Sequence, residues 1–92
     1  DFPYFLGYAD ETGSHDGVGF NVNLPLSRGA TWAQWRLAFD EACARVRAFA
    51  PDVLVVSLGV DTFKGDPLSA FQLESDDFLR LGAGIAALGL PT

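Results

Sequence analysis

An acidic loop that directly follows an apolar run holds the residues best suited to chemistry in this 92-residue chain. Residues 53–58 are rich in β-branched side chains, and Asp61 and Asp66 come shortly after them. An apolar run without polar alternation is typical of a parallel strand covered on both faces. Ligands of open α/β sheets bind beyond the carboxyl ends of the strands, so Asp61 stands where a metal ion or a substrate would be met.

The same loop also fits ordinary turn chemistry. Gly59 allows the chain to turn after the apolar run, and Pro67 prevents an immediate helix. Aspartate side chains in loops commonly accept hydrogen bonds from their own backbone, which would explain both Asp61 and Asp66 without a ligand. The local pattern alone leaves the two interpretations open.

The rest of the chain predicts the elements that position this loop. Residues 19–26 alternate apolar and polar side chains and predict a strand, with Pro25 at its end or at a sheet edge. Residues 32–49 predict a helix with Thr31 as N-cap and Gln34 completing a capping box. Its apolar stripe includes two tryptophans, which helical spacing favours as core residues over a ligand platform.

A second helix is predicted from Ser75, which would act as its cap, to about Leu88, with Gly89 as terminator. Asp76 and Asp77 are interpreted as partners of the helix dipole. The order strand, helix, strand, helix predicts an α/β fold with a parallel βαβα unit.

Four segments carry a resemblance to a known family: residues 4–11, 17–26, 57–67 and 88–92. In order and spacing they resemble the histone deacetylase and acetylpolyamine amidohydrolase family of zinc-dependent amidohydrolases, most closely its bacterial acetylpolyamine amidohydrolase branch. The resemblance implies an arginase-deacetylase three-layer sandwich, of which residues 1–92 would form a single partial domain. In that family, zinc polarises the amide carbonyl of an acetylated amine and its bound water attacks.

The resemblance also implies roles for three residues. Asp61 matches a zinc ligand of the family, Phe5 matches a residue that lines the acyl channel, and Leu68 matches a residue that borders it. Together they would form one wall of a deacetylase pocket.

The chain departs from the family pattern where most of the catalytic groups are expected. The Asp-x-His motif, the paired histidines and the Gly-Gly-Tyr motif of the family have no counterpart, and the chain has one histidine, His15, and one cysteine, Cys43. A catalytic zinc needs about three protein ligands. We therefore assign no catalytic residue and expect an excised piece that is inactive and holds no zinc alone. His15 fits a solvated loop residue, and Cys43 fits a small core hydrophobe.

Composition excludes some classes of partner. The net charge of −6 and a pI near 4.3 argue against nucleic acid and anionic membranes, which require clustered basic residues. No apolar run reaches the roughly 18 residues of a spanning helix. A single cysteine excludes an intramolecular disulfide and suits a cytoplasmic location.

Two other functions remain as alternatives. Hydrophobic residues make up 49% of the chain, which predicts apolar surface left for a partner and a homo-oligomer, a dimer or higher. The chain would then be a non-catalytic, self-associating or partner-binding module. A small nucleotide-binding domain is disfavoured, because Gly17 and Gly19 precede the predicted strand instead of following it.

Overall fold

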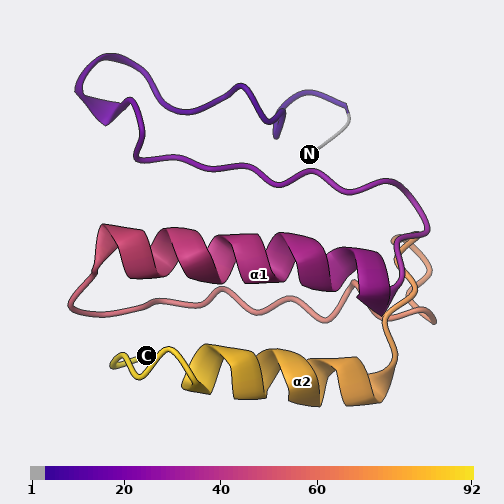
Figure 1. Ribbon diagram of the computed structural model, residues 1–92. Helices are drawn as coiled ribbons and strands as arrows, with labels where there is room; N and C mark the ends of the chain where they lie inside the picture. Colours follow the sequence, from indigo (N-terminus) through magenta and orange to yellow (C-terminus); the bar gives the residue numbers. More distant parts are fainter. Residues whose placement is uncertain (1–3) are drawn as a thin grey trace.

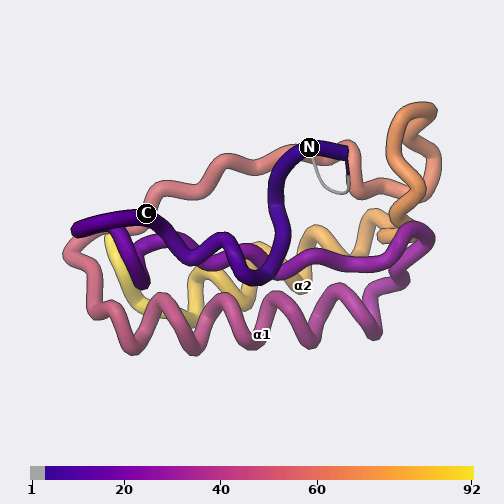
Figure 2. Tube along the Cα trace, turned by 90° about the horizontal axis from the view of Figure 1, so that it is seen from above, coloured from indigo at the N-terminus to yellow at the C-terminus, as the bar shows by residue number. Residues whose placement is uncertain are grey.

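The computed structural model describes residues 4–92, in which two helices lie beside two long extended segments (Figure 1). The helices are α1, Trp32–Phe49, and α2, Ser75–Ala86, and a short 3-10 turn, η1, spans His15–Gly17. The extended segments, residues 20–28 and 51–60, run in one direction, and both helices run in the opposite direction (Figure 1). Seen from above, α1 and residues 51–60 lie on opposite sides of the molecule (Figure 2).

Helix α1 has the bounds that the sequence predicts. Thr31 and Gln34 form the predicted capping box, in which the Thr31 N–H donates to Gln34 Oε1 at 3.0 Å. The helix ends where Ala50 adopts a left-handed conformation with φ of 53°, directly before Pro51. Three of its large aromatic rings stack in series, because the centroids of Trp32 and Trp35 are 5.8 Å apart and those of Trp35 and Phe39 are 5.6 Å apart.

Helix α2 differs from the prediction at both ends. Glu74, and not Ser75, is the N-cap, because its backbone N–H donates to the buried carboxylate of Asp77 at 2.9 Å. The helix stops at Ala86, two residues before the predicted Leu88. The amides of Leu88 and Gly89 bond three residues back instead of four, to Ile85 O and Ala86 O at 3.1 Å, which tightens the chain into a turn.

The two predicted strands are the main correction. Residues 4–92 contain no β-strand, and one isolated parallel bridge joins Phe63 to Leu73. Residues 19–26 and 53–58 are extended but share no ladder of hydrogen bonds in the described structure. A strand exists only through its neighbour, so an extended segment without a partner strand stays unassigned. The expected cover on both faces is missing as well, since Val55 is 86% exposed.

The buried interior is small and lies between the helices and the loop that follows residue 60. The buried apolar residues among those described are Ala30, Cys43, Leu73 and Leu81. Helices α1 and α2 approach closely where the ring of Phe39 lies against Gly84. Neither described helix is long and apolar enough to cross a membrane.

Candidate functional site

A cavity of about 760 Å³ lies where three parts of the chain meet. One part is Tyr4, the second is the end of the first extended segment, and the third is the loop that follows the second extended segment. Both segments reach this end of the molecule with their carboxyl ends, which is where open α/β folds place ligands. The lining residues are Tyr4, Leu24, Pro25, Leu26, Ser27, Arg28, Asp61, Leu68, Ser69, Ala70 and Phe71.

Two of the three residues predicted from the resemblance share this cavity. Asp61 and Leu68 both line it, although seven positions separate them. Phe5 does not line the cavity; its neighbour Tyr4 does, and Phe5 itself is 82% exposed. The structure therefore brings Asp61 and Leu68 to one cavity and leaves Phe5 outside the lining, next to Tyr4 in the sequence.

Gly59 leaves space for the Asp61 carboxylate. A β-carbon placed on Gly59 would come within 2.8 Å of Asp61 Oδ1, so the carboxylate occupies the space that a side chain at residue 59 would need. The turn is closed by a 3.1 Å hydrogen bond from Phe63 N to Val60 O. Gly59 itself lies outside this turn, which spans residues 60–63, and serves the close approach of the Asp61 side chain.

Asp66 holds the part of the loop that carries Leu68. Its Oδ1 accepts hydrogen bonds from Leu68 N at 2.8 Å and from Ser69 N at 2.9 Å. This is the turn chemistry that the sequence offered as one interpretation of Asp66. The Asp66 carboxylate therefore orders the backbone of Leu68 and Ser69, which both line the cavity, and affects the cavity through the conformation of the loop.

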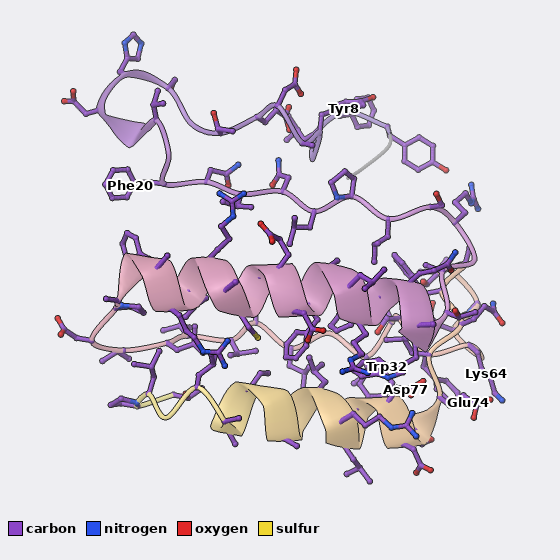
Figure 3. The ribbon with its side chains drawn as sticks, in the orientation of Figure 1. Tyr8, Phe20, Trp32, Lys64, Glu74 and Asp77 are labelled. Carbon is purple, nitrogen blue, oxygen red and sulfur yellow. The ribbon has the colours of Figure 1, made fainter. Side chains whose placement is uncertain are left out.

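The base of the loop is anchored to both helices. Leu73, which is 1% exposed, accepts a hydrogen bond from Lys64 N at 2.9 Å, and its own N–H donates to Thr62 O at 3.2 Å. Gln72 N donates to Ala30 O at 3.0 Å, directly before α1. The Lys64 ammonium pairs with Glu74, the cap of α2, at 2.8 Å (Figure 3). Backbone hydrogen bonds and one ion pair therefore hold both ends of the loop in place.

The described residues do not complete a metal site. Across residues 4–92, no three His, Cys, Asp or Glu side chains are grouped so as to hold a metal ion. Asp61 is one carboxylate, while a catalytic zinc takes about three protein ligands and keeps one open position. This residue set does not fit a bound zinc, and no catalytic step through a metal follows from it.

His15 and Cys43 lie away from the cavity. His15 is exposed in η1 with φ of 50°, as expected for a loop histidine. Cys43 is buried in α1, as its place in the apolar stripe predicts. Burial raises the pKa of the Cys43 thiol; the charge of Arg47 lowers that pKa, and the charge of Asp40 raises it.

The comparisons with known proteins agree with the sequence resemblance. The profile of the histone deacetylase domain matches residues 1–91. The chain belongs to the histone deacetylase domain family. It is 58% identical over 92 residues to acetylpolyamine amidohydrolase 1 of Pseudomonas aeruginosa, covering 100% of this chain and 27% of that protein. It is 48% identical over 90 residues to the acetylpolyamine amidohydrolase of Mycoplana ramosa, covering 98% of this chain and 26% of that relative.

A solved structure of a similar protein agrees with this family assignment. The crystal structure of an acetylpolyamine aminohydrolase from Burkholderia pseudomallei superimposes with a TM-score of 0.94 at 45% identity, and the match covers 99% of this chain and 27% of that chain. The chain is thus a fragment of an acetylpolyamine amidohydrolase-like fold and spans about a quarter of the length of these relatives.

Sequence reasoning missed one side of the cavity. Tyr4 and Arg28 both line it, and neither was singled out as a site residue. Arg28 follows the predicted strand of residues 19–26, just as Asp61 follows the apolar run of residues 53–58. The rule that ligands gather at the carboxyl ends of parallel segments, applied to the first segment too, would have pointed to Arg28.

Proposed function

We propose that this chain forms part of a zinc-dependent deacylase that hydrolyses acetylated amines of the acetylpolyamine type. Asp61 supplies one carboxylate to the zinc, Leu68 borders the acyl channel, and Phe5 lines it. The remaining metal ligands and the catalytic acid and base come from parts of the fold that residues 4–92 do not supply. In the complete fold, residues 19–26 and 53–58 are strands of a parallel βαβα unit.

One observation carries this proposal: Asp61 and Leu68 line the same cavity in a chain that belongs to the histone deacetylase domain family. A carboxylate is a regular zinc ligand, and an apolar side chain beside it suits a channel for an acyl group. The carboxyl ends of both extended segments lead into this cavity, which supports a site there.

The test uses a hybrid enzyme in which this 92-residue chain replaces the matching quarter of acetylpolyamine amidohydrolase 1 of Pseudomonas aeruginosa. We expect the hybrid to bind zinc and to release acetate from an acetylated polyamine. Asp61→Ala should lower both zinc content and turnover by at least about a hundredfold, the scale of losing a group that acts on the transition state. Asp52→Ala, at an exposed aspartate near the start of the second extended segment, is the matched control.

Three results bear on the proposal. A folded hybrid that fails to turn over acetylated polyamines would overturn it, and so would an Asp61→Ala hybrid with full zinc and activity. The isolated chain should show no turnover with added zinc, because it supplies a single ligand from the cavity. Turnover by the isolated chain that Asp61→Ala abolishes would show that this chain needs no further ligand.

A second candidate function is a self-associating module. The observation that favours it is the exposure of large apolar side chains on both extended segments, including Phe20 at 72% and Val55 at 86%. Unpaired backbone on an extended segment invites pairing with another chain, and a two-fold dimer would cover both segments at once. We expect an interface above about 1,000 Å² in total. Light scattering that gives a stable monomer near 9.9 kDa at micromolar concentration would reject this module.

A further inference from the structure

The loop that carries Tyr4 and Phe5 is fastened to the first extended segment by one glutamate. Glu11 Oε2 accepts hydrogen bonds from Gly7 N at 2.6 Å, from Tyr8 N at 2.9 Å and from Asn23 Nδ2 at 3.3 Å. Hydrogen bonds to an ionised acceptor are about twice as strong as those between neutral groups. A single carboxylate oxygen therefore gathers donors from both sides of the turn.

The two asparagines of the extended segment complete this contact. The Asn23 amide nitrogen also donates to Tyr8 O at 2.9 Å, and the Asn21 amide nitrogen donates to Glu11 O. We call Glu11, Asn21 and Asn23 the carboxylate clamp. Asn21 and Asn23 are two positions apart, so their side chains leave an extended segment on the same side and reach the same loop.

The clamp is close in the sequence to cavity-lining residues on both of its sides. Asn23 directly precedes Leu24, the first cavity-lining residue of its segment, and Gly7 follows Phe5 by two positions. Tyr4, on the same loop, lines the cavity, and Figure 3 shows Tyr8 on the loop above the extended segment. The side-chain bonds of Asn21 and Asn23 link the loop of Tyr4 and Phe5 to the segment whose last residues line the cavity.

We propose that Glu11 and Asn23 are positioning residues that set where Tyr4 and Phe5 stand against the acyl channel. This role rests on the proposed deacylase function. Neither side chain lines the cavity, so the pair acts through the loop and does not touch the reacting atoms. Loss of the clamp should loosen the channel wall and weaken the binding of substrate, while the Asp61 end of the site keeps its geometry.

The experiment compares variants of the hybrid enzyme. Glu11→Ala should raise KM for an acetylated polyamine about tenfold, with kcat changed less than threefold and zinc content unchanged, as expected when contacts made equally in the ground and transition states are lost. Glu11→Gln keeps an acceptor oxygen for the Gly7 and Tyr8 amides and should recover most of the affinity. Asn23→Asp replaces a donor with an acceptor beside Glu11 and should match or exceed the effect of Glu11→Ala.

A matched control and a second readout separate positioning from general instability. Glu41→Ala removes an exposed glutamate that pairs with Arg45 on α1 at 2.7 Å, and it should leave KM unchanged. Hydrogen exchange of the peptide that covers residues 4–12 should rise in Glu11→Ala, while exchange over α1 stays constant.

The outcomes distinguish this inference from the function on which it rests. If the parent hybrid is active and Glu11→Ala leaves KM and loop exchange unchanged, the positioning role is wrong and the proposed function stands. The role is equally wrong if Glu11→Ala lowers kcat, zinc content and thermal stability together, since that is the signature of a damaged fold. An inactive parent hybrid would overturn the proposed function, and the positioning role would fall with it.

Discussion

The carboxylate of Asp61 lies so close to Gly59 that a β-carbon at residue 59 would come within 2.8 Å of Asp61 Oδ1. Real β-carbons do not approach an oxygen this closely, so a side chain at residue 59 would force the Asp61 carboxylate to shift. Gly59 can be read from the sequence, whereas the position of the Asp61 carboxylate cannot.

Gly59→Ala should displace the Asp61 carboxylate and impair the hybrid enzyme. Misplacement of a reacting group by about 1 Å can cost about a hundredfold in rate, so we expect kcat/KM to fall by at least about tenfold, with lower zinc content. Gly17→Ala is the control, because a β-carbon at Gly17 meets no atom within 4 Å. Unchanged zinc content and turnover in Gly59→Ala would show that Asp61 does not depend on this glycine.

The helices were the most predictable part of the fold because their signals are local. The capping residues Thr31 and Gln34, the apolar stripe and Pro51 together define α1, and the structure has the same bounds. The sequence predicts Ser75 as the cap of α2, whereas Glu74 fills that role through its reciprocal bonds with Asp77. Serine is a preferred N-cap residue and glutamate is not, so the cap at Glu74 comes from its pairing with Asp77 and not from its residue type.

The strands could not be predicted from the chain alone, because strand pairing is not local. The apolar run at residues 53–58 is typical of a strand inside a sheet, yet its backbone has no ladder partner in the described structure. The run includes Leu54, whose N–H donates to Pro91 O at 2.8 Å, a contact between residues 37 positions apart that no local pattern indicates. The cavity forms only where three segments of the chain meet, and no local pattern places Tyr4 there.

Leu73 is expected to be the most sensitive apolar position of the site loop. Leu73 is 1% exposed, and its backbone forms an isolated β-bridge with Phe63. Leu73→Ala therefore removes buried methyl groups at the base of the loop. Substitutions of this kind lower the free energy of unfolding by about 2–5 kcal/mol. Leu79→Ala, at a position that is 73% exposed on α2, should change it by less than about 0.5 kcal/mol. Urea titrations of the chain, followed by tryptophan fluorescence, give both values, and equal effects would contradict the burial of Leu73.

Two glycines of α2 should respond in opposite ways to the same substitution. Gly82→Ala meets no atom within 4 Å and should raise the free energy of unfolding by up to about 1 kcal/mol through helix propensity. A β-carbon at Gly84 would come within 2.5 Å of the ring of Phe39, so Gly84→Ala should lower it by about 1–3 kcal/mol through overpacking.

The same urea titrations test the glycine pair, because the only tryptophans, Trp32 and Trp35, stack in line with Phe39. Phe39→Leu combined with Gly84→Ala should recover part of the loss, since the smaller side chain makes room for the methyl group. If Gly84→Ala stabilises the chain as much as Gly82→Ala, the close contact between α1 and α2 at Phe39 is wrong.

Cys43 should react slowly with alkylating reagents, with a pH dependence set by its burial. Burial raises the pKa of the folded thiol above the ordinary value near 8.5, so the thiolate, which is the reactive form, is scarcer than in the unfolded chain. The stability linked to this thiol is complete below the unfolded pKa and is lost as the pH rises through the folded pKa, because the unfolded chain releases its proton first. Iodoacetamide modification between pH 7 and pH 10 should therefore show a higher midpoint in the native chain than in urea.

The charge of Arg47 also affects the pKa of Cys43. Its positive charge lowers the pKa of Cys43, against the effect of burial, so Arg47→Ala should move the alkylation midpoint to still higher pH. Arg45→Ala is the matched control, because Arg45 pairs with Glu41 on the exposed surface of α1 and is not among the causes of the shift. A native midpoint equal to that in urea would mean that Cys43 is not buried. A midpoint that Arg47→Ala leaves in place would mean that the guanidinium does not act on the thiol, and burial alone would then set the pKa of Cys43.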